Sequence, residues 1–398
     1  MSLSQRPRVI IFSDHLLYPS ETFIQAQAGA LSEFQPVFAG SRRVRGLDLR
    51  EQHLYTINQG DIWGRIRELR FKLLGHAPGL VKRLKALDPV LLHAHYGPNG
   101  LRALALRSRL RIPLIVTFHG SDVTIRNLRG QKSHLGFRAY LGKKDKLKES
   151  GALFLAVSRF LRGKLLAQGF PEESVLVQYT GVDTKKFRPE STESGPLVLF
   201  VGRLVESKGC EFLIRAVAEV QKQLPEAELA LIGDGRLRAD LERRAKQSLR
   251  RYRFLGACAS DEVREWMNRA SLICVPSVRR PSGEEEAFGM VCAEAQAVAK
   301  PVVAFRSGGI PEIVLHGQTG FLAAEGDCQS LAEFLSLLLQ NSELRQRFGR
   351  AGRDLVLRQF DLERCTGLLE QTYRRAIGAG AATSEGQFLR ESIVNCSS

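Results

Sequence analysis

Short apolar runs recur along both halves of the chain, with room for a helix between most of them. Most of these runs are continuous rather than alternating, as strands covered by helices on both faces require. The runs predict strands over Val9–Ser13, Val90–Ala94, Leu114–Phe118, Leu153–Val157 and Val175–Gln178, and then over Leu197–Val201, Leu229–Ile232, Tyr252–Leu255, Leu272–Val275 and Val302–Phe305.

Longer amphipathic stretches separate the apolar runs and predict helices, for example over Glu211–Leu224, Arg236–Ser248 and Leu331–Leu339. Repeated strand–helix units favour parallel sheets joined by right-handed crossovers. At 398 residues a single core has usually divided into domains. We therefore expect an α/β fold of two doubly wound, Rossmann-like domains that face a central cleft.

The stretch Phe187–Pro196 is polar and rich in helix-breaking residues, which is typical of a linker. It divides the chain into an expected first domain over residues 1–188 and a second over 189–360. A C-terminal helix over 361–378 is expected to cross back to the first domain, and residues 379–398 to form a flexible tail.

Ligands of doubly wound sheets bind beyond the carboxyl ends of the strands, so the loops after the strands are the first places to look for chemistry. The loop from Gly202 to Gly209 follows one predicted strand and precedes a helix. Glycine lets a ligand approach the backbone, and a helix start favours anions. Arg203 and Lys208 add two cations there, so the loop predicts a diphosphate site; a solvated turn is the alternative.

Two further loops follow predicted strands. Gly233-Asp234-Gly235 forms a tight turn, but it is not a GxGxxG sequence and carries little weight as a nicotinamide signature. The loop Ser307–Glu312 is glycine-rich, and we expect its backbone to line the same cleft.

The segment from Glu286 to Glu294 carries two acids around a helix that should start near Met290. Such a helix would put the acids roughly 12 Å apart at 1.5 Å per residue. This layout suits a ligand with phosphates at the helix start and hydroxyls at both ends, which is the layout of a nucleotide sugar. The alternative is that both acids lie on a solvated helix. This alternative explains poorly why one acid lies inside the apolar run MVCAEAQAVA.

The sequences GRLVESKG, EAFGMVCAEA and SGGIPE, at these spacings, resemble the donor domain of family 4 retaining glycosyltransferases of the GT-B fold, and the resemblance covers nearly the whole chain. It implies that Arg203 and Lys208, with the backbone at Gly202, hold the donor diphosphate. It also implies that Glu286 contacts the transferred sugar and Glu294 the ribose. The backbone at Phe288, Gly289, Met290 and Val291 would approach the sugar and phosphate, and the base would contact the loop after Leu255.

His119 follows a predicted strand, in the sequence TFHGSD. By the same resemblance it lies beside the transferred sugar, so His119 is the expected catalytic residue, with Arg203, Lys208 and Glu286 as catalytic partners; a core or turn histidine is the alternative. Asp122 would orient His119 or bind the acceptor. Retaining enzymes of this fold are described by front-face displacement, which needs no protein nucleophile. The chain has no Asp-x-Asp sequence, so neither a metal nor another cofactor is expected.

The N-terminal segments PSETFI, HAHYGPNG and TFHGSD resemble a narrower group, the colanic-acid and related exopolysaccharide transferases. Ser20, Glu21 and Thr22 would cap a helix or face the acceptor. The first loop lacks the Gly-Gly pair of many relatives, which leaves acceptor contacts there open.

The positive charge of the chain lies entirely in its first half. Residues 1–190 hold 31 Lys and Arg against 15 Asp and Glu, whereas residues 191–398 hold 27 of each. The stretches 126–148 and 65–85 interleave cations with apolar residues, so we expect the N-terminal domain to meet an anionic membrane surface that carries a lipid-linked acceptor. A soluble basic face is the alternative.

The seven cysteines form no CxxC pair, which favours free thiols and a reducing compartment. No signal peptide or run of about eighteen apolar residues is present. The expected location is therefore cytoplasmic, peripheral on the inner face of the cell membrane.

The sequence predicts a hexosyltransferase with an NDP-sugar donor (UDP or GDP) and a glycan or lipid-linked acceptor in cell-surface polysaccharide biosynthesis. A nucleotide-sugar epimerase on the same fold is one alternative. A basic nucleic-acid- or membrane-binding protein is another, given a pI near 9.8, but no nucleic-acid partner is expected because the positive charge stops at the domain boundary. The third, a catalytically inactive scaffold, is disfavoured by the matched Arg203, Lys208, Glu286 and Glu294.

Overall fold

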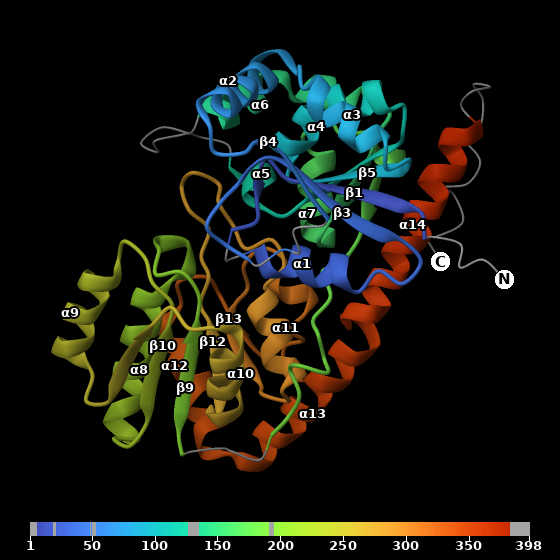
Figure 1. Cartoon of the computed structure of the whole chain (residues 1–398). Helices are drawn as coiled ribbons and strands as arrows, with labels where there is room; N and C mark the ends of the chain where they lie inside the picture. Colours follow the sequence, from blue (N-terminus) through green and yellow to red (C-terminus); the bar gives the residue numbers. More distant parts are fainter. Residues whose placement is uncertain are drawn as a thin grey trace.

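The computed structural model describes residues 6–18, 21–47, 49, 53–125, 135–190 and 195–382. Its first half forms a parallel sheet in the order β2-β3-β1-β5-β6-β7-β8, with β4 also paired to β3 (Figure 1). The strands are β1 (Arg8–Phe12), β2 (His15–Leu16), β3 (Gln35–Arg43), β4 (Leu54–Asn58), β5 (Pro89–His95), β6 (Leu114–Phe118), β7 (Leu153–Ala156) and β8 (Val175–Val177).

The second half forms a separate parallel sheet in the order β11-β10-β9-β12-β13-β14. Its strands are β9 (Leu197–Val201), β10 (Glu228–Ile232), β11 (Tyr252–Gly256), β12 (Leu272–Val275), β13 (Val302–Phe305) and β14 (Gly320–Ala323). The expected α/β fold of two doubly wound, Rossmann-like domains is confirmed. Its central strands are buried on both faces, which explains their continuous apolar sequences.

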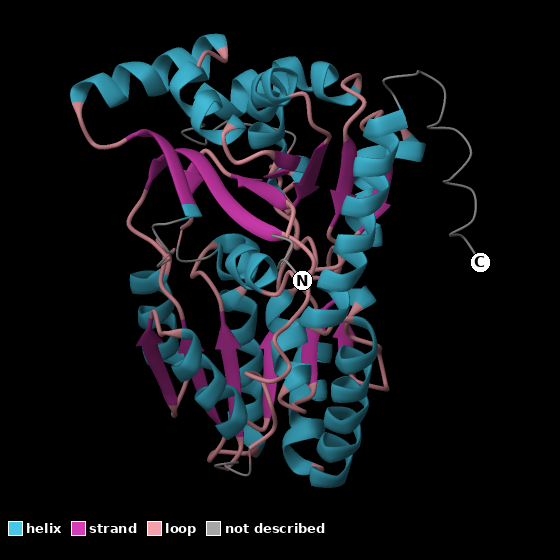
Figure 2. Cartoon of the chain, turned by 45° about the vertical axis from the view of Figure 1, so that its right-hand side comes forward, coloured by secondary structure: helices cyan, strands magenta, loops and turns pink. Residues whose placement is uncertain are grey.

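Helices cover both sheets (Figures 1 and 2). The first half holds α1 (Thr22–Gly29), α2 (Ile62–Leu74), α3 (Pro78–Lys85), α4 (Gly97–Leu110), α5 (Ser121–Thr124), α6 (Leu135–Lys148) and α7 (Arg159–Leu166). The second holds α8 (Cys210–Gln223), α9 (Arg238–Ser248), α10 (Ser260–Arg269), α11 (Met290–Ala297), α12 (Cys328–Gln340), α13 (Ser342–Gln359) and α14 (Leu362–Ala382). Short 3₁₀ turns include η4 (Glu206–Lys208) and η5 (Ile310–Glu312).

In each sheet the chain starts in the middle, builds toward one edge and then returns to build toward the other. This reversal falls between β1 and β5 in the first sheet and between β9 and β12 in the second. Ligands of open parallel sheets bind at such reversals, beyond the carboxyl ends of the strands. The loops that follow β9 and β12 therefore occupy the favoured place for a ligand.

The last helix, α14, leaves the second half and packs against the first, beside α1 and β5 (Figures 1 and 2). Its buried Glu370 accepts hydrogen bonds from the Ser32 N–H, the Ser32 hydroxyl and the Glu33 N–H at 2.7–2.9 Å. Helix α14 ends at Ala382, four residues beyond the predicted end at 378. Residues 383–398 of the predicted tail and 191–194 of the predicted linker lie outside the described residues, and the domain limits remain our proposal.

The predicted strands all occur, and β6, β9, β12 and β13 have the predicted bounds. The predicted helices correspond to α8, α9 and α12, each within a few residues. The pattern missed β3, β4 and the short strands β2 and β14. The sequence of β3, QPVFAGSRR, contains proline and glycine and ends in exposed arginines, so its apolar run is short.

The described part of the stretch 126–148 does not have the structure expected of a membrane-facing segment. Residues 126–134 lie outside the described residues, and the remainder forms α6. Tyr140 and Leu147 of α6 are buried in the domain core, with Phe137 packed beside them. The apolar side of α6 therefore serves the core rather than a membrane surface.

No helix in the described part of the chain is both long and apolar enough to cross a bilayer. The cysteines that the structure describes, Cys210, Cys258, Cys274, Cys292, Cys328 and Cys365, are free thiols.

Candidate active site

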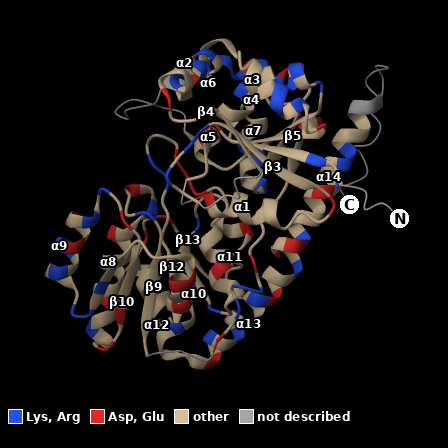
Figure 3. Ribbon diagram, in the orientation of Figure 1, with Lys and Arg blue, Asp and Glu red and all other residues tan. Residues whose placement is uncertain are grey.

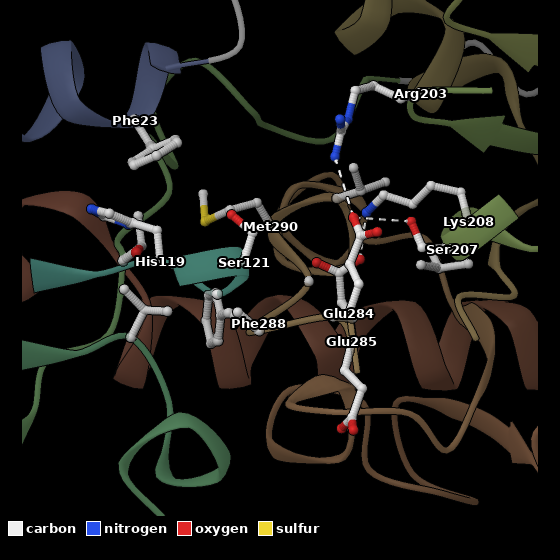
Figure 4. A pocket seen from close by; sticks show the side chains of 18 of the residues that line it. Phe23, His119, Ser121, Arg203, Ser207, Lys208, Glu284, Glu285, Phe288 and Met290 are labelled. Carbon is white, nitrogen blue, oxygen red and sulfur yellow. Dashed lines mark hydrogen bonds and ion pairs between the residues drawn. The ribbon is translucent and has the colours of Figure 1, made fainter. Parts of the chain in front are cut away.

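A cavity of about 410 Å³ lies between the two halves of the chain. In Figure 4, Phe23 and His119 lie at one end of it and Arg203, Ser207 and Lys208 at the other. The predicted site residues that line the cavity are His119, Arg203, Lys208, Glu286, Phe288, Gly289, Met290 and Val291. Gly202, Asp122 and Glu294 are not among its lining residues.

The loop after β9 places Lys208 by a turn that only glycine can close. Gly209 has φ of 64°, and a Cβ atom there would lie 1.9 Å from the carbonyl oxygen of Pro276. The residue also forms the N-cap of α8. The predicted strand–loop–helix context of Arg203 and Lys208 is therefore present, with the loop packed against the end of β12.

Lys208 and Glu286 form an ion pair at the cavity wall. The Lys208 Nζ atom lies 2.5 Å from Glu286 Oε2, and the Ser277 hydroxyl donates to the same oxygen at 3.2 Å. Burial would raise the pKa of Glu286, but the Lys208 ammonium, the Ser277 hydroxyl and Arg203 together outweigh burial, and the pKa lies below its usual value. Glu286 is therefore a carboxylate at neutral pH and can accept hydrogen bonds.

The acidic triplet 284–286 is divided among three sets of partners. Glu284 lies 3.9 Å from a guanidinium nitrogen of Arg203, whose side chain is 67% exposed. Glu285 pairs with Lys164 of the first domain at 3.1 Å. Arg203 is thus loosely held at the mouth of the cavity and free to turn toward a ligand, whereas Glu285 joins the two domains.

Helix α11 directs its N-terminus at the cavity. It begins at Met290 as predicted, and its N-cap, Gly289, has φ of 93° and offers no side-chain cap. Met290 and Val291 line the cavity. An uncapped helix start attracts anions through its N–H groups and dipole.

The glycine-rich loop Ser307–Glu312 is not among the residues that line the cavity, contrary to our expectation. It instead supports the segment that does. The Gly309 N–H donates to the Glu286 carbonyl at 2.9 Å, and a Cβ atom at Gly308 would meet that oxygen at 1.8 Å. The glycines therefore allow two backbones to pack closely behind the site.

Glu294 lies on α11, three residues after Val291, and is mostly buried. Residues three apart share one face of a helix, so Glu294 lies on the same face as Val291, one turn beyond the last residue of α11 that lines the cavity. Burial raises the pKa of Glu294 to about 7. The expected convergence of two cations and two carboxylates on one pocket thus holds for Arg203, Lys208 and Glu286, and Glu294 lies outside it.

His119 follows β6 and lies among aromatic rings. Its Nε2 atom is 3.0 Å from Nδ1 of His95, the two rings stack with centroids 5.2 Å apart, and Phe23 and Tyr96 pack on it at 4.9 and 4.7 Å. Burial, with a smaller effect from His95, holds the pKa of His119 well below its ordinary value. His119 is therefore a neutral hydrogen-bonding group at neutral pH.

Asp122 is buried behind His119, and its carboxylate accepts three backbone hydrogen bonds. The donors are the N–H groups of Gly97 at 2.9 Å, Gly120 at 2.8 Å and His119 at 3.2 Å. Burial raises the pKa of Asp122 to about 6, although these hydrogen bonds oppose the rise. Of the two roles considered for Asp122, this geometry favours orienting His119 over contact with an acceptor.

Gly202 continues the β9 ladder, since its N–H donates to the Ile232 carbonyl at 2.9 Å. A Cβ atom at Gly233 would lie 1.9 Å from the Gly202 carbonyl oxygen. Gly202 and the Gly233 turn therefore pack against each other, behind the cavity wall.

Phe23, Tyr96, His95 and Ser277 were not predicted as site residues. Tyr96 has φ of 72°, an uncommon conformation for a residue with a side chain and one often found at functional sites. The segments PSETFI and HAHYGPNG contain Phe23, His95 and Tyr96, so the resemblance of these segments was the available signal.

The expected cap of α1 differs in detail. Pro19 and Ser20 lie outside the described residues, and Glu21 occupies the N-cap position without a side-chain bond into the helix. Its carboxylate accepts instead from the N–H of Tyr18 at 2.8 Å.

Two family models together match most of the chain. The model described as "Glycosyltransferase Family 4" matches residues 21–186, and the model described as "Glycosyl transferases group 1" matches residues 182–355.

Several curated proteins are similar in sequence. An uncharacterized glycosyltransferase of Methanocaldococcus jannaschii is 32% identical over 71% of this chain and 74% of its own length. The amylovoran biosynthesis glycosyltransferase AmsK of Erwinia amylovora is 32% identical over 65% of this chain and 63% of its own. WcaL of Escherichia coli, provisionally named a colanic acid biosynthesis glycosyltransferase, is 31% identical over 62% and 61%. The matched region spans less than two thirds of AmsK and WcaL.

Solved structures share the fold. HepE of Anabaena, in complex with UDP, has a TM-score of 0.74 at 20% identity and covers 93% of this chain and 100% of its own. The sucrose-phosphate synthase of Thermosynechococcus elongatus has a TM-score of 0.74 at 21% identity and covers 94% and 100%. These likenesses establish the GT-B fold.

Proposed function

Because this chain belongs to the glycosyltransferases of family 4 and group 1, which have the GT-B fold, we propose that it transfers a hexose-type sugar. The donor would be a UDP- or GDP-sugar and the acceptor a glycan or a lipid-linked molecule. The transfer would retain the configuration of the sugar and would need no metal ion. The observation that carries the proposal is the cavity of about 410 Å³, with two cations at one end and His119 at the other. HepE has been solved with UDP-glucose, which favours a nucleotide-sugar donor here as well.

The diphosphate of the donor would bind at the cationic end. Arg203 and Lys208 lie at this end, and Met290 and Val291 at the start of α11 line the same cavity. Lys208 already pairs with Glu286, so a bound diphosphate would share the ammonium with this carboxylate. The nucleoside would then extend along α11 toward Glu294, whose carboxyl group would accept from the ribose hydroxyls.

The transferred sugar would lie between Glu286 and His119. The ionised Glu286 would accept from sugar hydroxyls, and the neutral His119 would offer one ring nitrogen for a further hydrogen bond. Together, Glu286 and His119 would restrict the sugar to one orientation over the diphosphate, which favours the reacting geometry.

The reaction would proceed by front-face displacement. The bond between the anomeric carbon and the diphosphate oxygen breaks while the acceptor hydroxyl approaches the same face, and the departing diphosphate takes the proton of that hydroxyl. Negative charge grows on the diphosphate as the bond breaks. Arg203, Lys208 and the α11 dipole would stabilise this charge, and such stabilisation is usually a large part of catalysis.

The acceptor would enter from the first domain, where Phe23 and Tyr96 line the cavity beside His119. Aromatic rings of this kind pack well against sugar faces. The exopolysaccharide names of AmsK and WcaL support a role in cell-surface polysaccharide biosynthesis. The basic first domain supports a peripheral position on the inner face of the cell membrane.

A thermal-shift screen of UDP, GDP and their common sugar derivatives tests this function. We expect at least one of them to stabilise the protein and to be consumed when a suitable acceptor is added. The absence of stabilisation by any common donor would contradict the proposal. Conversion of the donor to an epimer without an acceptor would identify a nucleotide-sugar epimerase instead.

A further inference from the structure

Helix α2 turns apolar side chains away from the protein. Ile62, Ile66, Leu69 and Leu73 are 64, 44, 57 and 70% exposed. At about 100° per residue these four fall within an arc of roughly 60°. Phe71, on the opposite side of the helix, is buried in the core. A surface helix normally has the reverse arrangement, with its apolar side inward.

Trp63 and Leu74, which are 65 and 74% exposed, widen this surface. We call the six residues Ile62, Trp63, Ile66, Leu69, Leu73 and Leu74 the apolar face of α2. The other exposed large apolar side chains among the described residues, Tyr18, Leu337, Leu357 and Leu368, are single positions on other elements. An apolar surface gathered on one helix marks an interaction site more often than scattered residues do.

Cations border the apolar face of α2 on both sides. On the same helical projection, Arg65 lies about 40° beyond one edge of the face and Arg67 about 20° beyond the other, while Arg70 falls within it, between Ile66 and Trp63. Lys82 and Lys85 on α3 are exposed as well. Figure 3 shows Lys and Arg on α2, α3 and α4 at this end of the first domain. An apolar helical face bordered by cations is typical of helices that lie in the interface of an anionic bilayer.

We propose that α2 docks the protein on an anionic phospholipid bilayer, with its apolar face inserted among the lipids and its axis along the surface. The helix has thirteen residues and is therefore about 20 Å long, too short to span a bilayer. Anionic headgroups would neutralise Arg65 and Arg70. A second copy of the chain, paired through the same face, would instead bring like charges together.

The helix is joined to the catalytic half of the first domain. Lys72 of α2 lies 3.2 Å from Asp14, which follows β1. The neighbouring Ser13 accepts from the Asn99 amide at 3.2 Å, and that amide also donates to the His95 carbonyl at 2.7 Å. Docking through α2 would therefore fix the acceptor side of the cavity at the membrane, which, given the function proposed above, is where a lipid-linked acceptor resides.

Trp63 provides a direct probe of this docking. The chain has two tryptophans, and Trp266→Phe leaves Trp63 as the single reporter. Addition of vesicles of phosphatidylcholine with phosphatidylglycerol should shift the Trp63 emission to the blue, and the protein should float with them. Vesicles of phosphatidylcholine alone should bind at least about tenfold more weakly, because the electrostatic part of the attraction is absent.

A matched pair of double variants distinguishes binding through α2 from nonspecific adsorption by any exposed leucine. Leu69→Asn/Leu73→Asn should lower binding to the anionic vesicles by at least about tenfold. Leu337→Asn/Leu357→Asn, at exposed leucines of α12 and α13, should leave it unchanged. Circular dichroism checks that all variants are folded, and donor binding without vesicles should be equal in all of them, so that a failure of docking is distinguished from a failure of the proposed activity.

Three outcomes would overturn the proposal. The first is that the wild-type protein does not bind anionic vesicles. The second is that both double variants lose binding to these vesicles equally. The third is a dimer in sedimentation velocity without vesicles that Leu69→Asn/Leu73→Asn disperses, because a second copy would then be the partner of α2.

Discussion

The ammonium of Lys208 lies 2.5 Å from a carboxylate oxygen of Glu286, although 78 residues separate the two in the sequence. The pair joins the loop after β9 to the segment before α11, on the two sides of the reversal in the second sheet. Glu286 is kept ionised by this contact, and Lys208 is held where a donor diphosphate would bind. The pair therefore links the two ends of the proposed donor, phosphate and sugar.

Glu286→Gln tests the sugar end of this pair. The amide keeps the shape of the side chain but loses the charge that accepts strongly from hydroxyls. We expect kcat of sugar transfer to fall about a hundredfold or more, which is roughly 3 kcal/mol of transition-state stabilisation. Affinity for the bare nucleoside diphosphate should not weaken, because a negative charge beside the phosphates has been removed. If calorimetry showed diphosphate binding falling in parallel with transfer, Glu286 would not belong to the sugar.

His119 is predicted to act as a neutral hydrogen-bonding group. Because its pKa lies well below the ordinary value, kcat/KM should show no titration of this residue between about pH 6 and 8. His119→Ala should lower kcat about ten- to hundredfold. His76→Ala, at an exposed histidine of the same domain, serves as the control. A wild-type profile that loses an inflection near pH 7 in His119→Ala would show that the imidazole exchanges a proton in that range.

Glu294 should make stability depend on pH in the absence of donor. Its pKa in the folded protein, about 7, lies above the ordinary value of 4.5 because of burial. As the pH rises, Glu294 therefore loses its proton in the unfolded chain before it does so in the folded protein. The stability that the proton contributes is fully present below about pH 4.5 and is lost as the pH rises through 7. Chemical denaturation should show a fall on the order of 2 kcal/mol across this window, reduced in Glu294→Gln. Identical pH curves for both proteins would refute the assignment.

Glu370 is predicted to fasten α14 to the first domain. Glu370→Ala leaves the backbone N–H groups of Ser32 and Glu33 without their acceptor and should lower the free energy of unfolding by about 2–3 kcal/mol. Glu363→Ala on the same helix removes only an exposed pair with Lys185 and should change the melting temperature little. Equal melting of the two variants would show that the Glu370 contacts contribute nothing measurable.

The strands of both sheets were accessible from the sequence because burial on both faces demands continuous apolar runs such as LIVTF and LVLFV. β3 was missed because its proline, glycine and terminal arginines shorten that run. The sequence also could not show that the apolar side of α6 packs against the domain core. A pattern of apolar residues at helical spacing shows that a helix is amphipathic, and it does not show whether the apolar side meets a core or a membrane.

The loop residues Arg203, Lys208 and Glu286 were predictable because each follows a strand at the edge where ligands bind. The inward residues of the first domain were harder. Tyr96 sits at a positive φ, and His95 acts by contact with His119, and neither property has a signature in a single sequence. Glu294 was placed in the pocket by the spacing of the two acids around a helix start and by resemblance, whereas in the structure it follows the cavity wall one helical turn farther along.

Titration calorimetry of UDP and GDP against Lys208→Met tests the central claim most directly. We predict that the wild-type protein binds at least one of the two, and that Lys208→Met weakens this binding at least about tenfold, since the charge nearest the diphosphate has been removed. Lys222→Met, at an exposed lysine of α8, should bind as the wild type does. Equal affinity of Lys208→Met and the wild type for every nucleotide that binds would contradict the diphosphate site.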